Sequence, residues 1–186
     1  MLSMLTALWL PILVATIVVY LAEMIVNMVL PYHRKDFRAI PDEDGIRDVV
    51  RSRGLARGQY YFPYADSAET MKSPEWLAKM KEGPVGLLLI AGNSASMTPM
   101  LIRQFVLDLF IVFVVAYLAS AALAPGAEYL EVFQITGTAA LLAYASSHFV
   151  YGIWYNFQWR LIWTRAAEGL VYALLVAGVF GWLWPT

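Results

Sequence analysis

Long apolar stretches are the feature that most restricts what this 186-residue chain can fold into. At 1.5 Å per residue, each stretch is long enough as a helix to cross a hydrocarbon core of about 30 Å. Only 15% of the residues are charged, whereas a soluble domain carries about 25%. The sequence therefore predicts transmembrane helices over about Leu5–Leu30, Met100–Ala124, Leu130–Asn156 and Trp159–Trp184.

The links between the last three stretches are very short, and Pro125-Gly126 provides the first of them. Short links force neighbouring helices to run antiparallel. We therefore expect an all-α membrane protein, a four-transmembrane-helix up-down bundle with a small mixed α/β cytoplasmic insert. The predicted division is transmembrane helix 1 in residues 1–30, the insert in residues 31–98, and helices 2–4 in residues 99–186.

Basic residues predict the orientation of these helices. Ten of the 13 Lys and Arg residues lie between the first and second stretches, and positively charged loops remain in the cytoplasm. This places residues 31–98 in the cytoplasm and both termini outside, in a multi-pass membrane protein. The net charge of −1 gives no bias toward nucleic acid.

The insert divides into short elements with their own signals. Asp42 to Arg53 is expected to form a helix with acidic residues at its start and arginines at its end. Ser73 and Pro74 begin a second helix that stops at Gly83. Gln59–Phe62 and Val85–Ile90 are β-like runs that are expected to pair. Few large aliphatic residues are available, so we expect a thin core that leans on the membrane surface or on a partner.

Polar and charged residues inside the apolar stretches give the strongest functional signal. Ionisable groups are costly in a membrane, yet each stretch carries one about eight to nine residues from its inner boundary. With their helical neighbours they predict an inward-facing buried polar cluster of Glu23, Asn27, Arg103, Asp108, His148, Arg165 and Glu168.

Three roles are open for this cluster. Its members can satisfy one another and fix the helix register, or form a proton or ion relay through carboxylates and imidazole. The third role is a metal site, whose ligands would be Glu23, Asp108, His148 and Glu168.

Small residues recur every four positions in the last stretch, at Gly169, Ala173, Ala177 and Gly181. Such a stripe allows two helix backbones to approach closely. We expect this stripe to be a helix-packing surface.

Missing residues exclude several chemistries. The chain has no cysteine, so it forms no iron–sulfur cluster and no covalently attached haem c. It also lacks the phosphate-binding loop, the nucleophile elbow, the zinc-protease motif and the dinucleotide fingerprint. These absences favour a role other than catalysis, and the sequence assigns no catalytic residue.

Several short runs outside the apolar stretches carry a resemblance: His33–Phe37, Pro41–Asp44, Gly58–Tyr60 with Phe62-Pro63, Glu82–Gly86 and Gly181–Pro185. With these runs the chain resembles a family of uncharacterised small bacterial inner-membrane proteins with four transmembrane helices and a long hydrophilic loop after the first. The resemblance implies a bacterial origin and that fold, and it transfers no catalytic residue.

Two functions follow as hypotheses. The first is an accessory or structural component of a larger membrane assembly, whose partners are lipid and other membrane subunits or a second copy of the chain. The alternative is a small membrane protein that handles protons, ions or a metal at the buried carboxylate–histidine cluster.

Overall fold

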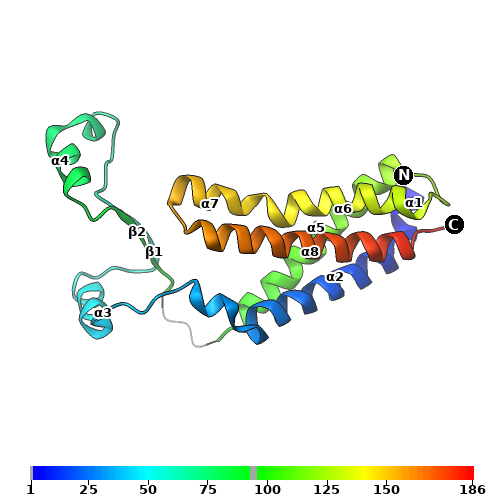
Figure 1. Cartoon of the computed structure of the whole chain (residues 1–186), viewed down its shortest axis with the longest axis horizontal. Helices are drawn as coiled ribbons and strands as arrows, with labels where there is room; N and C mark the ends of the chain where they lie inside the picture. The colour runs from blue at the N-terminus through cyan, green and yellow to red at the C-terminus, as the bar shows by residue number, and fades with distance from the viewer. Residues whose placement is uncertain (1, 93–95) are drawn as a thin grey trace. The chain divides into compact units, whose positions relative to one another are not determined.

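The protein is described here by a computed structural model that covers residues 2–92 and 96–186. The chain forms two compact units (Figure 1). Unit 1 runs up to Arg38 and resumes from Met97 to Thr186, and unit 2 is Ala39–Ser96. Unit 1 contains all the long helices, and unit 2 contains the small sheet.

Unit 1 is helical throughout. Three of its helical segments, Trp9–Val29, Thr98–Ala122 and Trp159–Trp182, are long and apolar enough to cross a membrane. The first, second and fourth expected stretches are thus confirmed as candidate spans, with small shifts at their ends. The helical elements are α1 (Leu2–Ala7), α2 (Trp9–Met24), the π turn η1 (Ile25–Val29), the 3-10 turn η2 (Pro31–Lys35), α5 (Thr98–Ala122), α6 (Tyr129–Ala145), α7 (Ser147–Tyr155) and α8 (Trp159–Trp182).

The third expected stretch is interrupted, and this differs from the continuous helix that the sequence predicts. Helix α6 ends at Ala145 and α7 begins at Ser147. Between them, the Ser146 hydroxyl donates to the carbonyl of Leu142, four residues earlier. Serine bonds of this kind compete with the helical ladder and bend helices. Neither α6 nor α7 alone has the length of a membrane span.

The helices of unit 1 enclose an apolar core. Helix α6 packs along α8, α2 packs on both α8 and α5, and α5 packs on α6 (Figure 1). The C-terminal segment closes one end, because Trp184 Nε1 donates to Ala124 O at 3.0 Å and Gly126 N donates to Pro185 O at 2.8 Å. The fully buried large side chains of the core include Leu8, Val19, Val112, Val132, Val176 and Phe180.

Small residues bring α6 and α8 into close contact. A Cβ atom added to Gly169 would lie 2.6 Å from the carbonyl oxygen of Tyr144, and one added to Gly181 would lie 2.6 Å from the ring of Tyr129. Ala173 and Ala177 are buried on the same helix. The structure thus places the small-residue stripe of α8 against α6, within the unit.

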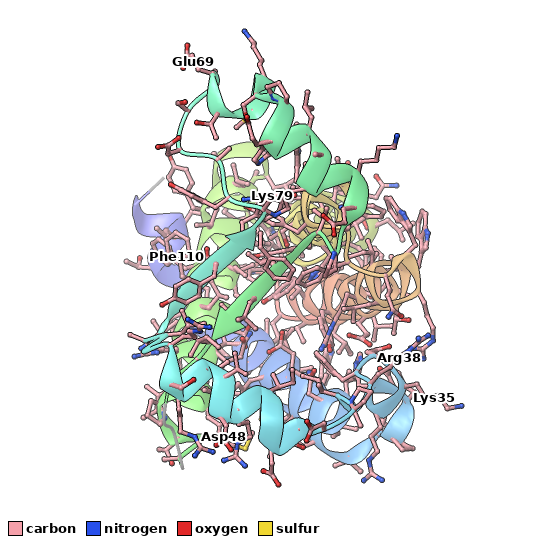
Figure 2. The ribbon with its side chains drawn as sticks, turned by 90° about the vertical axis from the view of Figure 1, so that its left-hand side faces the viewer. Lys35, Arg38, Asp48, Glu69, Lys79 and Phe110 are labelled. Atoms are coloured by element: carbon pink, nitrogen blue, oxygen red, sulfur yellow. The ribbon has the colours of Figure 1, made fainter. Side chains whose placement is uncertain are left out.

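The outer faces of the long helices are apolar. Large exposed side chains include Leu21 on α2, Phe110 on α5 (Figure 2) and Leu174 on α8. Water would solvate such surfaces poorly, whereas lipid tails match them. This distribution agrees with a membrane protein.

Unit 2 follows the sequence prediction closely. Its helices and strands are α3 (Glu43–Ser52), β1 (Gly58–Phe62), the 3-10 turn η3 (Thr70–Lys72), α4 (Pro74–Glu82) and β2 (Gly86–Ile90). Strands β1 and β2 pair antiparallel from Gly58 with Ile90 to Phe62 with Gly86. The Ser73 hydroxyl accepts from Trp76 N at 3.2 Å at the start of α4. Of the described residues 39–92, none is fully buried, so the core is thin as expected.

The boundary between the membrane part and the insert lies later than predicted. The sequence predicts it after residue 30, whereas unit 1 extends to Arg38. The reason is that His33 and Asp36, just after α2, pair with side chains of α8. The residues that follow the first membrane helix therefore belong to the helical unit.

Candidate functional site

A cavity of about 470 Å³ lies among the helices of unit 1. Polar side chains from α2, η1, α5, α6, α7 and α8 reach it, together with apolar ones. This volume falls within the range of about 300–1,000 Å³ that is usual for small-molecule sites. The polar lining residues are Glu23, Asn27, Gln104, Tyr144, Ser147, His148, Arg165, Glu168 and Tyr172.

Glu23 lines this cavity, and Asp108, which is buried beside Glu23, does not line it. Only 8% of Glu23 and 0% of Asp108 are exposed, and the two carboxyl groups lie close enough to interact with one another. Gln104 Nε2 donates to Asp108 Oδ1 at 3.2 Å. Within residues 2–92 and 96–186, neither carboxyl has a basic side chain within ion-pairing distance.

The lack of a basic partner determines how the Glu23–Asp108 pair can be charged. Two ionised carboxylates in contact would repel strongly away from water, and a single proton held between them removes the repulsion. Even so, Glu23 Oε2 and Asp108 Oδ2 have no hydrogen-bond partner among the described residues. The pair therefore holds acceptor capacity that the protein leaves unused.

Glu168 is the third buried carboxylate, and it is surrounded by donors. The Tyr32 hydroxyl donates to Glu168 Oε1 at 2.7 Å. Arg165 Nη1 donates to Glu168 Oε2 at 3.1 Å and to Asn27 Oδ1 at 2.7 Å. Glu168 is therefore compensated by partners from η2 and from its own helix, unlike the Glu23–Asp108 pair.

The surroundings of Tyr32 change the pKa of its phenol. Burial is the main cause that raises the pKa of Tyr32 to about 12, and the hydrogen bond to Glu168 and its negative charge act in the same direction. The phenol therefore stays protonated at neutral pH and remains a donor to Glu168.

His33 links Glu168 to a second carboxylate. Its Nδ1 lies 2.7 Å from Asp36 Oδ2, and its Nε2 lies 2.8 Å from Glu168 Oε1, although at an angle that misses a hydrogen bond. The buried Asp36 also pairs with Arg160 at the start of α8. Both ring nitrogens can act as donors only in the imidazolium form.

Sequence reasoning missed Tyr32, His33, Asp36 and Arg160 as site residues. His33 lies in a basic group with Arg34, Lys35 and Arg38, directly after the first apolar stretch. The structure separates that group, because Lys35 and Arg38 are exposed (Figure 2) whereas His33 is largely buried. One sequence signal could have identified these site residues, namely an acidic residue among basic ones directly after an apolar stretch.

Most of the predicted buried polar cluster is brought together. Glu23, Asp108 and Glu168 are buried, and His148 is half-buried at the cavity. Asn27, although exposed overall, lines the cavity and accepts from Arg165.

Arg103 is the exception, and its predicted inward position is wrong. It is exposed and does not line the cavity. Five residues separate it from Asp108, which rotates the two side chains about 140° apart on a helix. With Asp108 facing inward, Arg103 has to face outward.

The predicted metal ligands Glu23, Asp108, His148 and Glu168 do not form a metal site. Among residues 2–92 and 96–186, no group of three or more His, Asp or Glu side chains is arranged to hold a metal ion. Glu168 instead accepts from Tyr32 and Arg165, and Asp108 accepts from Gln104.

No family model, curated protein or solved structure matches this chain. Its function is therefore inferred from the geometry and chemistry of unit 1.

Proposed function

We propose that this chain is an integral membrane protein that handles protons at the cavity of unit 1. The observation that carries the proposal is the buried Glu23–Asp108 pair, which contacts the cavity side chains and has no basic partner among the described residues. Ionisable groups without structural compensation inside membrane helices are typical of proton pathways. A purely structural pair would be expected to use all its acceptor atoms.

Groups able to accept and donate protons continue from this pair toward the end of unit 1 that holds η2. Tyr144 and His148 line the same cavity as Glu23. Glu168 follows, and through His33 it connects to Asp36. Carboxyl, phenol and imidazole groups are the side chains that relay protons in membrane proteins.

The proposed topology has four crossings. Helices α2, α5 and α8 provide three candidate spans, and the pair α6 and α7 provides the fourth, because it packs on α5 and α8. The concentration of Lys and Arg in residues 31–98 supports a cytoplasmic position for that segment. Both termini then lie outside. The bacterial inner membrane is the location that the resemblance noted above implies.

Proton flux into proteoliposomes tests the function. Purified full-length protein is reconstituted with a pH-sensitive dye inside, and a potassium gradient with valinomycin drives proton entry. Glu23→Gln and Asp108→Asn preserve shape but remove the ionisable groups, and each is expected to lower the flux by roughly a hundredfold. Glu131→Gln, an exposed acidic residue at the start of α6, is the matched control and should keep wild-type flux. Equal flux in all four proteins, or none above empty vesicles, refutes the proposal.

An accessory role in a larger assembly is the second candidate, and the exposed apolar side chains favour it. Trp9, Phe110 and Trp182 are examples that a partner subunit would cover as well as lipid does. Purification in a mild detergent followed by native mass measurement tests this role. A stoichiometric second protein supports it, and a lone monomer or homo-oligomer refutes it.

A further inference from the structure

Two buried hydroxyl groups at the cavity lack partners, in addition to the carboxyl oxygens. The hydroxyls of Tyr144 and Tyr172 have no hydrogen-bond partner among the described residues, although only 7% and 6% of these residues are exposed. Buried polar atoms in folded proteins are bonded in the great majority of cases. With Glu23, both tyrosines line the cavity, so unused polar atoms converge on it. Such a set of atoms is typical of a binding site.

The rest of the cavity wall is apolar and adaptable. Met24, Met28, Met97 and Met100 line it, and the last three are more than half exposed, so the cavity is open on their side. Methionine side chains are flexible and polarisable, and they are common on surfaces that accept varied apolar ligands. This wall would accommodate an aliphatic or aromatic body.

The charges at the cavity favour a cation over an anion. Arg165, the basic residue that an anion would need, already donates to Asn27 and Glu168. The Glu23–Asp108 pair, with one shared proton, keeps one negative charge without a basic partner. The rings of Tyr144 and Tyr172 stand edge to face, 5.9 Å apart, and aromatic faces attract ammonium groups.

We propose that this cavity binds a small organic cation, an alkyl or aryl ammonium, whose charged head displaces the proton shared by Glu23 and Asp108. The apolar body of the cation lies among the methionines. In this exchange the site releases one proton for each cation that it binds, so charge is conserved. The inference rests on the proposed proton-handling function and names the substrate that exchanges with the proton.

Several titratable groups besides Asp108 influence the protonation of Glu23. Those that share its cavity are Tyr144 on α6, His148 on α7, and Arg165, Glu168 and Tyr172 on α8. Since protons and cations compete for one pair of carboxyls, affinity for the cation should increase as the pH rises.

Calorimetry with benzyltrimethylammonium tests the inference on the full-length protein in detergent. At about pH 8 we expect saturable binding with roughly one proton released, measured in two buffers of different ionisation enthalpy, and at least about tenfold weaker binding at about pH 5. Benzenesulfonate, of similar size but opposite charge, should not bind. Glu23→Gln should weaken binding at least about tenfold, and Glu131→Gln should leave it unchanged.

Failure of this inference is separable from failure of the proposed function. Binding needs no membrane, so an absence of cation binding in protein that still conducts protons overturns only the inference. Equal binding of benzenesulfonate, or cation binding without proton release in the wild-type protein, also overturns it, even if Glu23→Gln fails to fold. Cation binding in protein that conducts no protons supports the site and refutes the flux proposal.

Discussion

Substitution of Gly169 by alanine tests how tightly α6 and α8 pack. A Cβ atom at Gly169 would lie 2.6 Å from the Tyr144 carbonyl oxygen, 2.7 Å from its carbonyl carbon and 2.9 Å from Ala145 Cα. All three are backbone atoms, so no side chain can rotate away. Ordinary contact distances are about 3.5–4.0 Å, and the two helices would have to separate locally by about 1 Å.

Gly178 offers a matched control on the same helix. A Cβ atom there meets nothing within 4 Å, so Gly178→Ala gains helix propensity of up to about 1 kcal/mol without a clash. Gly169→Ala gains the same propensity but incurs the cost of overpacking, about 1–3 kcal/mol. We therefore expect Gly169→Ala to be less stable than Gly178→Ala by about 1–3 kcal/mol.

Reversible unfolding in mixed micelles measures this difference. Sodium dodecyl sulfate is added stepwise, and loss of helix is followed by circular dichroism. The expected order of stability is Gly178→Ala, wild type, then Gly169→Ala. If Gly169→Ala proves as stable as Gly178→Ala, the close approach of the two backbones does not limit packing, and the reasoning fails.

Three further predictions concern the edges of the two units. Arg160→Ala removes the arginine partner of the buried Asp36 and should lower the free energy of unfolding by about 1–3 kcal/mol, since Arg160 is half exposed. Arg47→Ala, in an exposed ion pair, should lower it by less than about 0.5 kcal/mol. Equal losses for the two variants in the same unfolding assay would contradict this prediction. The raised pKa of Tyr32 means that its phenol stabilises the fold fully below about pH 10, the value of a free tyrosine, and that this contribution is lost as the pH rises through about 12. The stability difference between wild type and Tyr32→Phe should therefore shrink over that interval, and a constant difference would show that ionisation plays no part. Ser73→Ala removes the oxygen that caps α4 and should cost about 1 kcal/mol of local stability, visible as faster amide exchange in α4, and unchanged exchange would count against the cap.

Local signals explain which parts of the fold could be predicted. Apolar stretches of span length predicted α2, α5 and α8, and capping residues such as Asp42 and Ser73 predicted where α3 and α4 begin. The β-like composition of Gln59–Phe62 and Val85–Ile90 predicted the pairing of β1 with β2. In each case the residues that determine the element lie within or directly beside it.

The break near Ser146 shows where such signals are insufficient. The apolar stretch continues through it, so hydropathy alone predicts one helix. At the break, the Ser146 hydroxyl donates to the carbonyl of Leu142. Thr136 makes the same kind of bond within the continuous part of α6, so the position of such a residue alone did not predict the break.

Helical periodicity determined which face of each long helix carries polar groups, and this was enough to predict Glu23, Asp108 and Glu168 as buried at one site. Only the tertiary structure decided their partners. Tyr32 bonds to Glu168 across 136 positions of the chain, and Arg160 pairs with Asp36 across 124. The spacing of residues along one helix fixes the directions of their side chains around its own axis. The packing of the whole unit sets the rotation of one helix against another, and it also sets the fold of the turn after α2.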